Sequence, residues 1–368
     1  MNAYRQLVRP LLFRLEPERA HDLAIGACRA LGASAAGRAA TAQMFGPPDD
    51  PRLRTTVAGI AFPSPVGLGA GWDKSASAVD VLTRMGFGSV EIGSVSRWAS
   101  SGNPIRPRAF RLPDDAALII NYGVPNDGSD VVARRLAAAH PAVPLGVNIV
   151  ETNTGSVRPE DEVIPELAAC AAALAPHAAF LVVSAECANA PGAHPFARIE
   201  NLRRLLDALA PIAQLPPVFI KIRVPADTIA DIVRVTDAYP FVRGFRVNTI
   251  AARPYAGLRT PRERWETMKG SLSSPALGFP AMLQAVRDWY VRCDPARYAL
   301  LASGGIRSGS DAYTALRNGA SLVQFVTALV YEGPALARRI NRELAALLAA
   351  DGFAAADAVV GIDVKEAA

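Results

Sequence analysis

The sequence has few of the residues that bind metals or form disulfide bridges. Its 368 residues include four cysteines, at positions 28, 170, 187 and 293, and none of them forms a Cys-x-x-Cys pair. The four histidines, at positions 21, 140, 177 and 194, are scattered as well. This spacing indicates neither a disulfide framework nor a zinc site built from Cys and His, and it fits a reducing compartment. We therefore expect a site without a metal ion.

Long apolar runs and long runs of like charge are also missing. No stretch reaches the roughly 18 apolar residues of a membrane-spanning helix, although 51% of the residues are hydrophobic. Arginines at positions 5, 9 and 14 interrupt the N-terminal apolar runs, which argues against a signal peptide. The net charge of +5 comes from intermixed charges of both signs. Such a balance suits a soluble protein near an anionic surface or ligand and does not require nucleic acid.

The N-terminal residues predict two helices ahead of a catalytic domain. Leucines recur at helical spacing from Leu7 to Leu15, and Pro17 marks a break before a second apolar stripe. We expect a helical extension over residues 1–45 and a second domain over residues 46–368. The extension can pack on that domain or lie on a membrane surface, and packing is the simpler interpretation.

The rest of the chain alternates between short apolar runs and helical patterns. Each run is rich in Val, Ile, Leu or Phe and bounded by Gly, Pro or Asn. The eight runs are 65–70, 89–95, 145–150, 180–185, 217–222, 244–250, 299–305 and 322–329. The helical patterns lie at 75–86, 129–139, 160–175, 198–211, 227–238, 279–292 and 309–318. This alternation predicts a (β/α)8 TIM barrel. A doubly wound open sheet is the rival fold, but no G-x-G-x-x-G follows the first strand.

Polar residues end several of these apolar runs, where the active site of such a barrel lies. Buried polar groups are costly unless they are paired, and a ligand with many hydrogen-bonding edges would pair them. Lys221, inside the fifth run, is the most informative of them. It can form an ion pair with a neighbouring strand, or it can stabilise an electron-rich ring that gains negative charge. Gly304, Gly305 and the helix start at 308–310 offer backbone amides that can bind a phosphate.

Several motifs together resemble one enzyme family. LFRLEPERAHDL (12–23) is similar to the N-terminal extension of the membrane-associated, quinone-using dihydroorotate dehydrogenases. GAGWDKSA (69–76), GFGSVEIGSVS (86–96) and NPIRPRAFRL (103–112) resemble the flavin-binding start of that family's barrel. GASLVQFVTALVYEGP (319–334) resembles its end. The resemblance implies an FMN-dependent dehydrogenase that acts on a CH–CH or CH–NH bond.

The resemblance also implies the roles of individual residues. The residues that would contact FMN are Ala70, Gly71, Lys74, Ser94, Asn148, Ser184, Lys221, Val247, Gly304, Gly305, Val326 and Thr327. Those of the substrate pocket would be Lys74, Asn121, Tyr122, Gly123, Asn189, Asn248 and Thr249. Cys187 stands at the position of the proton-abstracting base, and Lys221 would stabilise the reduced flavin. A thiol, with an ordinary pKa of about 8.5, suits the role of that base.

Other positions depart from the family. Ser184 replaces the asparagine that ends strand 4, the loop at 121–127 is one residue shorter and lacks an arginine, and Cys187 replaces the serine usual for the quinone-using class. Glu151 and Glu186 add negative charge near the expected pocket. They would repel a carboxylate such as dihydroorotate unless both point to solvent. We therefore predict a paralogue that oxidises a neutral or partly cationic amide or amino-acid derivative.

Three other functions stay open. The long match allows a genuine dihydroorotate dehydrogenase of pyrimidine biosynthesis, and a flavin barrel that binds without turnover is a non-enzymatic alternative. A flavin enzyme that reduces uracil in RNA also uses a barrel cysteine, but the chain has no basic, aromatic-rich patch, and we expect no nucleic-acid partner. Lys74, Lys221 and Cys187 favour an enzyme over a binding protein.

By the same resemblance, the N-terminal helices would form a quinone tunnel that opens onto a membrane. His21 and Arg108 match positions that would line the tunnel, although His21 can also be a helix-surface residue. A quinone is then the expected electron acceptor. The implied location is the cytoplasm, with peripheral attachment to the inner membrane.

Overall fold

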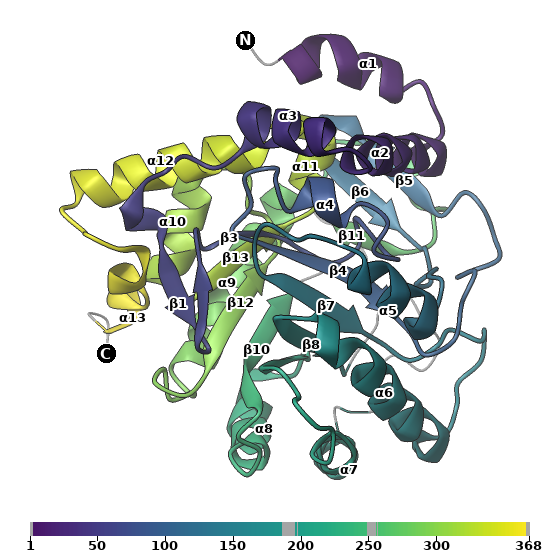
Figure 1. Ribbon diagram of the computed structural model, residues 1–368, viewed down its shortest axis with the longest axis vertical. Helices are drawn as coiled ribbons and strands as arrows, with labels where there is room; N and C mark the ends of the chain where they lie inside the picture. Colours follow the sequence, from purple (N-terminus) through teal and green to yellow (C-terminus); the bar gives the residue numbers. More distant parts are fainter. Residues whose placement is uncertain (1–2, 186–195, 197, 249–254, 256, 366–368) are drawn as a thin grey trace.

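Eight parallel strands form a closed barrel (Figure 1). The computed structural model describes residues 3–185, 196, 198–248, 255 and 257–365. The barrel strands are β3 (Val66–Leu68), β4 (Ser89–Val95), β7 (Leu145–Ile149), β8 (Phe180–Ser184), β9 (Val218–Lys221), β10 (Val242–Asn248), β12 (Ala299–Ser303) and β13 (Leu322–Phe325). They pair in chain order, and β13 pairs with β3 to close the barrel. The predicted TIM barrel is confirmed, and each predicted apolar run overlaps one barrel strand.

Helices cover the outside of the barrel, whose parallel strands are buried on both faces. These helices are α4 (Val79–Leu82), α5 (Ser129–Ala137), α6 (Glu160–Leu174), α7 (Ile199–Leu209), α8 (Ile229–Thr236), α9 (Pro275–Tyr290), α10 (Gly309–Arg317), α11 (Thr327–Glu332) and α12 (Leu336–Ala350), followed by α13 (Ile362–Lys365). Helix and strand side chains share one large core, in which Phe245 of β10 packs on Trp289 of α9. Burial of this apolar surface is the main force that holds the barrel closed.

The predicted helix at 75–86 is much shorter than expected, because the loop after β3 continues to residue 78. The carboxylate of Asp73 accepts hydrogen bonds from three backbone N–H groups between residues 75 and 78, at 2.7 to 3.2 Å. Ala76 has a φ of 56°, which an α-helix does not accommodate. The loop therefore keeps a fixed shape and carries Lys74 at the end of β3.

A hairpin plugs the N-terminal end of the barrel. It consists of β1 (Thr55–Val57) and β2 (Ile60–Phe62), which pair antiparallel. Val57 and Phe62 pack with Phe180, Phe219 and other strand residues in a separate apolar cluster. This end of the barrel is therefore filled with apolar side chains, which leaves the opposite end for a ligand.

A small antiparallel sheet, not predicted from the sequence, is formed outside the barrel. Its strands β5 (Ala109–Leu112), β6 (Ala117–Ile120) and β11 (Ser271–Ser273) pair in the order β11-β6-β5. Leu112, Ile119 and Leu272 pack with Trp265 in a cluster of their own. The strands are three or four residues long, too short for a clear alternation of apolar and polar residues.

The N-terminal extension contains three helical segments rather than the two expected. A π-helical turn (Tyr4–Val8) runs into α1 (Arg9–Leu12), and α2 (Pro17–Gly32) and α3 (Ala35–Phe45) follow. The break at Pro17 is confirmed. The second break was missed: the hydroxyl of Ser34 accepts a hydrogen bond from the Gly37 N–H and so starts α3.

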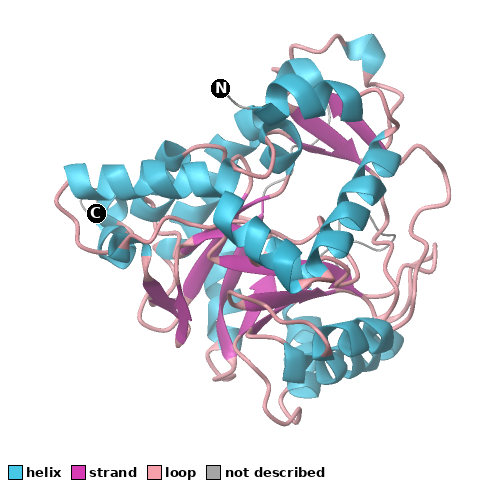
Figure 2. Cartoon of the chain, turned by 45° about the horizontal axis from the view of Figure 1, so that its top comes forward, coloured by secondary structure: helices cyan, strands magenta, loops and turns pink. Residues whose placement is uncertain are grey.

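The extension packs on the barrel domain at one end of the molecule. α2 contacts α4 and β5, and α3 contacts α4 (Figure 1). The turned view of Figure 2 shows these helices and the small sheet at the same end. Within the described residues, no helix combines the length and the apolar character needed to cross a bilayer.

Candidate active site

The predicted site residues gather at the C-terminal ends of the barrel strands. In strand order these ends carry Ala70, Gly71, Lys74, Ser94, Asn148, Ser184, Lys221, Val247, Asn248, Gly304, Gly305, Val326 and Thr327. Asn121, Tyr122 and Gly123 follow β6 of the small sheet. Cys187, Asn189 and Thr249 lie outside the described residues, as does Glu186, and their predicted roles stay predictions.

Five buried polar side chains form a hydrogen-bonded layer inside the barrel. Glu91 on β4 and Arg246 on β10 form an ion pair, with 3.2 Å between Arg246 Nη1 and Glu91 Oε1. Asn148 Nδ2 donates to Glu91 Oε1 at 2.9 Å, and Gln324 Nε2 donates to Glu91 Oε2 at 2.9 Å. The hydroxyl of Ser184 donates to Asn148 Oδ1 at 3.0 Å. Donors from three strands therefore bind the one buried carboxylate, that of Glu91.

Sequence reasoning missed Glu91, Arg246 and Gln324. A usable signal was present, because each is a polar residue in the middle of an apolar run, as Lys221 is. Glu91 and Arg246 are 1% and 5% exposed, so their opposite charges require each other. Within the described residues, Arg246 Nε and Gln324 Oε1 have no hydrogen-bond partner. A polar ligand at the strand ends would satisfy such atoms.

The glycine turn after β12 offers two backbone amides. Gly304 and Gly305 have φ values of 129° and 82°, which residues other than glycine rarely adopt. The amides at the start of α10 are already used: the Gly309 N–H donates to Glu343 Oε2 at 2.6 Å, and the Asp311 N–H donates to Ser308 Oγ at 3.1 Å. The predicted phosphate cradle is therefore limited to the glycine pair and its neighbours.

Lys74 links the strand ends to the N-terminal extension. Its Nζ lies 3.4 Å from Nε2 of His21 on α2 and 4.5 Å from the ring centroid of Tyr122. Burial lowers the pKa of Lys74 to about 8. Burial and the charge of Lys74 lower the pKa of His21 to about 3, so this imidazole is neutral. The Lys74 ammonium can then donate to His21 Nε2, which leaves the ring hydrogen on Nδ1.

The shortened loop at 121–127 is held by asparagines from two other loops. Asn103 Nδ2 donates to Asn121 Oδ1 at 2.9 Å, and Asn153 Nδ2 donates to the Gly123 carbonyl at 2.8 Å. Asn153 lies close in sequence to Glu151, a position that departs from the family. The shortened loop is therefore supported by the segment that carries Glu151.

Glu151 is partly removed from solvent. Its burial raises the pKa of its carboxyl to about 7, while the Arg158 guanidinium opposes this rise. Arg158 is committed to Glu166, with Nη1 at 2.7 Å from Oε2. Glu151 is therefore neither fully exposed nor fully buried. In the described part of the chain, no three His, Cys, Asp or Glu side chains gather as metal ligands.

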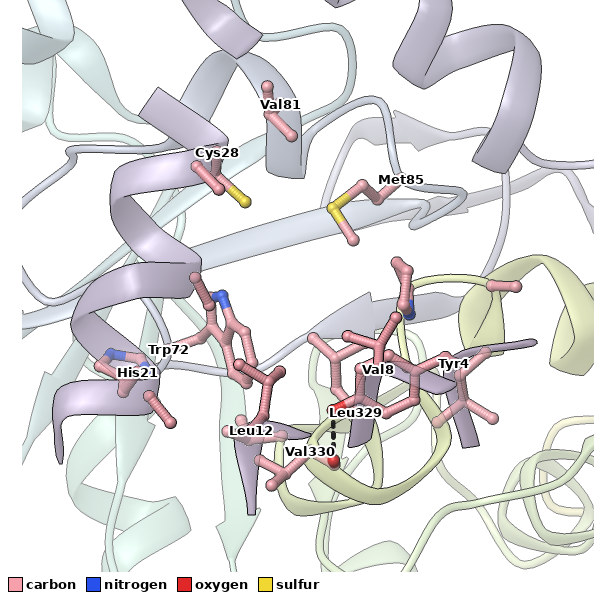
Figure 3. Close-up of a pocket in the computed structure, with 18 of the residues that line it drawn as sticks. Tyr4, Val8, Leu12, His21, Cys28, Trp72, Val81, Met85, Leu329 and Val330 are labelled. Carbon is pink, nitrogen blue, oxygen red and sulfur yellow. Dashed lines mark hydrogen bonds between the residues drawn. The ribbon is translucent and has the colours of Figure 1, made fainter. Parts of the chain in front are cut away.

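A cavity of about 940 Å³ lies between the N-terminal extension and the barrel. Its wall includes residues of all three N-terminal helices, the loop after β3, the small sheet and the α11–α12 segment. Leu12, His21, Cys28, Trp72 and Met85 surround it (Figure 3). At its inner end the wall contains Gly71, Lys74 and Val326, which are predicted flavin contacts. The cavity therefore reaches the candidate active site.

Two arginines line this cavity, Arg111 and Arg339, and the predicted Arg108 does not. Arg111 lines the cavity and donates to the Leu15 carbonyl at 2.8 Å. Arg108 is not among the lining residues; its Nη2 lies 2.7 Å from Glu18 Oε2 in a buried ion pair that ties α2 to the residue just before β5. His21 lines the cavity, as predicted, rather than the outer surface of its helix.

Comparison with known proteins identifies the family. The sequence model of the dihydroorotate dehydrogenase family matches residues 52–348. The chain belongs to this family. Its relatives include proteins named dihydroorotate dehydrogenase (quinone) from Mycobacterium ulcerans, at 36% identity over 98% of both chains, and Rhodospirillum rubrum, at 37% identity over 100% of this chain and 96% of that one.

Solved structures agree with this family assignment. The dihydroorotate dehydrogenase of Eimeria tenella in complex with ferulenol has a TM-score of 0.79 and 29% identity, with 95% of this chain and 96% of that chain covered. The ligand-free form has a TM-score of 0.80 and 30% identity, with 94% and 99% covered. The protein is therefore an FMN-dependent oxidoreductase that acts on CH–CH bonds.

The residues present fit FMN. Arg246 Nε and Gln324 Oε1 are buried hydrogen-bonding atoms without partners in the described residues. The space beside Gly71 is open, since no atom lies within 4 Å of a Cβ added there. A flat ring with polar edges and a phosphate would satisfy this set of groups.

Proposed function

We propose that the protein oxidises dihydroorotate and passes the electrons to a quinone. The cavity carries this proposal: an apolar space of about 940 Å³ joins the N-terminal helices to Lys74 at the strand ends. Relatives that match 96–100% of this chain at 36–37% identity bear the name dihydroorotate dehydrogenase (quinone). A quinone would enter from the helices, and the substrate would bind on the barrel side of Lys74.

The charge of Lys74 supports a carboxylate substrate. Among the described residues, no Asp or Glu oxygen lies within ion-pair distance of its ammonium, whose hydrogen-bonding neighbour is the neutral His21. A substrate carboxylate would supply the missing negative charge. Asn121 and Asn248 offer amide groups that would bind the amide edges of the substrate ring.

The chain's own residues would bind the cofactor and move the proton. FMN would be held by Ala70, Gly71, Lys74, Ser94, Asn148, Ser184, Lys221, Val247, Gly304, Gly305, Val326 and Thr327. Bound FMN would supply the acceptor for the hydride. Cys187 would take the proton from the adjacent carbon, with Asn189 and Thr249 completing the substrate pocket. Lys221 lies opposite Ser184 and Arg246 in the strand register, and its ammonium would offset negative charge on the ring.

The test is an assay of the purified holoenzyme with dihydroorotate and a short-chain ubiquinone. We expect turnover, and we expect Cys187→Ala to lower kcat by roughly 10²–10⁴-fold, the usual contribution of a general base. The variant should keep the yellow absorbance of bound flavin. Turnover that survives in Cys187→Ala would remove the thiol from the mechanism, and a wild-type protein inactive with dihydroorotate would overturn the substrate assignment.

A neutral or partly cationic substrate is the second candidate, and Glu151 favours it. A half-buried carboxylate near the strand ends would repel an anion, and Ser184 already donates to Asn148. Dihydrouracil separates the candidates, because it is dihydroorotate without the carboxylate. If kcat/KM is higher for dihydrouracil, the substrate is a neutral amide. If kcat/KM is higher for dihydroorotate, the substrate is a carboxylate, and Lys74 decides the specificity.

We further propose that residues 1–45 form a membrane-facing unit and residues 46–368 the FMN-binding barrel. Leu7, Leu11, Leu23 and Met44 of the extension are 67%, 62%, 58% and 60% exposed. These apolar side chains stand close in sequence to arginines, a combination that suits binding to the surface of an anionic membrane. The protein would then attach peripherally to the cytoplasmic face of the inner membrane, where a quinone can reach the cavity.

A further inference from the structure

Glu18 of α2 places a buried carboxylate against the barrel domain. The residue is 5% exposed, and its Oε2 accepts a hydrogen bond from Arg108 Nη2 at 2.7 Å. Its Oε1 accepts a second bond from the backbone N–H of Arg108 at 3.2 Å. Carboxylates this deeply buried are stable only when they are paired. Glu18 therefore fixes both the side chain and the backbone of Arg108, and it does so from the N-terminal extension.

Arg108 passes this constraint to the loop that precedes it in the sequence. The residue is 4% exposed, and its Nη1 donates to the carbonyl of Ser101 at 2.6 Å and to that of Asn103 at 3.2 Å. A guanidinium carries several N–H donors in a fixed planar arrangement, so one side chain can bind the carboxylate and the loop at the same time. A displacement of Glu18 would therefore turn the guanidinium and release residues 101–103.

Asn103 and Arg108 in turn hold two residues of the predicted substrate pocket. Asn103 Nδ2 donates to Asn121 Oδ1 at 2.9 Å, and the Asn103 N–H donates to the Tyr122 carbonyl at 2.9 Å. The Asn121 N–H donates to the Arg108 carbonyl at 2.7 Å. The Arg108 guanidinium also lies 5.5 Å from the centroid of the Tyr122 ring. These contacts form an unbroken chain from α2 to Asn121.

The substrate loop depends on this chain because it has little regular structure of its own. Strand β6 ends at Ile120, and the structure shows residues 121–125 in neither a helix nor a strand. Side-chain hydrogen bonds therefore decide where the Asn121 amide lies, and its Nδ2 group can donate to a carbonyl of a ligand. The same contacts set the Tyr122 ring against Lys74, whose Nζ lies 4.5 Å from the ring centroid. A loop with few contacts opens locally when they are lost.

We propose that Glu18 and Arg108 are positioning residues of the substrate site: through Asn103 they hold the Asn121 amide in place, so that the N-terminal extension helps to set the affinity for the substrate. This inference rests on the proposed role of Asn121 in substrate binding. Both residues act through Asn103 rather than by contact with the substrate. Because coupling between two sites is reciprocal, a substrate bound at Asn121 also stabilises the docked position of α2.

The first test compares the wild-type holoenzyme with Glu18→Gln, which keeps the shape of the side chain and removes its charge. Titration of the flavin absorbance with orotate measures the dissociation constant, which we expect to rise by roughly tenfold, the effect of one hydrogen bond. The rate of flavin reduction at saturating dihydroorotate should stay near the wild-type value, because a loss of binding raises KM and leaves kcat unchanged. An unchanged dissociation constant overturns the proposal.

Two further variants separate this chain of contacts from a general loosening of the extension. Arg338→Met is the matched control, because Arg338 also ties the extension to the barrel domain: its Nη1 donates to the Met44 carbonyl of α3 at 2.9 Å. This variant should bind orotate as tightly as the wild type. If Glu18 acts through Asn103, the double variant Glu18→Gln/Asn103→Ala binds orotate no more weakly than Asn103→Ala alone. An equal loss in Arg338→Met, or losses that add in the double variant, overturns the proposal.

Hydrogen exchange of the wild-type holoenzyme tests the same coupling without a substitution, so this test does not depend on the folding of a variant. Orotate should slow the exchange of backbone amides in α2 near Glu18 as well as in residues 121–123. Slower exchange in residues 121–123 without any change in α2 overturns the proposal.

These outcomes also separate this inference from the proposed function. If the wild-type holoenzyme binds uracil but not orotate, the proposed substrate is wrong, and the same titrations with uracil decide the role of Glu18. If the wild type binds orotate and Glu18→Gln binds it equally tightly, the inference alone is wrong. If the wild type binds neither ligand, both are wrong.

Discussion

Arg246 and Glu91 are the residues on which the polar interior of the barrel depends. Their side chains meet at 3.2 Å in a layer that also includes Asn148 and Gln324. Charges this deeply buried are stable only when they are paired. The ion pair therefore fixes the orientation of Asn148, which we propose as a flavin contact.

Removal of the Arg246 charge should destabilise the protein strongly. We predict that Arg246→Leu lowers the free energy of unfolding by about 3–5 kcal/mol, because the Glu91 carboxylate is left buried without its cation. Urea unfolding of the holoprotein measures this loss. The double variant Arg246→Leu/Glu91→Gln should recover much of the stability, because no buried charge remains. A double variant as unstable as the sum of the two single variants contradicts the assignment.

The ionisation of Lys74 should control the binding of anionic ligands. The pKa of Lys74 is about 8, so the side chain is a cation below this pH and becomes neutral above it. If a substrate carboxylate pairs with Lys74, the dissociation constant of orotate should rise by up to tenfold per pH unit above about pH 8. Flavin absorbance titrations at a series of pH values measure this dissociation constant. In Lys74→Arg, which keeps its charge in this range, the dissociation constant should not change with pH. A dissociation constant that does not change with pH in the wild-type protein would exclude the pairing.

At the scale of elements, the sequence predicts the barrel well because each barrel strand is buried on both faces. A parallel strand is a continuous apolar run, such as FLVV in β8, and eight such runs alternate with helical patterns. The sheet of β5, β6 and β11 was missed, because β6 and β11 pair across a separation of roughly 150 residues, which no local pattern reports.

The candidate site was predictable only in part for a similar physical reason. The polar ends of apolar strands could be read from the sequence, and the structure brings them to one end of the barrel. The ion pair between Glu91 and Arg246 and the contact between Lys74 and His21 join segments that are far apart in the sequence. No local sequence pattern therefore predicts them. Arg111 lines the cavity and Arg108 does not, which the motif alone did not settle.

The turn after β12 tolerates only glycine at Gly305. A Cβ added there would lie 2.5 Å from Cβ of Phe279, and the φ of 82° is strained for other residues. We predict that Gly305→Ala lowers both the melting temperature and the affinity for FMN. Gly59→Ala is a matched control, because Gly59 has a similar φ of 81° but no atom within 4 Å of the added Cβ. Thermal unfolding and flavin release measure the melting temperature and the FMN affinity of the two variants. Equal losses in both variants would show that backbone strain, and not the contact with Phe279, causes the effect.

At the scale of the whole molecule, the exposed apolar residues of the extension should mediate membrane binding. We predict that the double variant Leu7→Glu/Leu11→Glu reduces flotation with anionic liposomes several-fold, because it removes two exposed apolar side chains and adds negative charge. Val157→Glu is the control, since Val157 is 71% exposed but lies outside the extension. Unchanged flotation of the double variant would place the membrane contact elsewhere or exclude it.

Substrate and quinone should bind in separate spaces that meet at Lys74. The most direct test fills the cavity with Ala24→Trp, a substitution in the wall formed by the N-terminal helices. Stopped-flow absorbance then follows flavin reduction by dihydroorotate and flavin reoxidation by a short-chain ubiquinone as separate steps. We expect an unchanged rate of reduction and a rate of reoxidation at least tenfold lower, because a bulky side chain blocks the cavity. Reoxidation at the wild-type rate, or an equal loss in both steps, would contradict it.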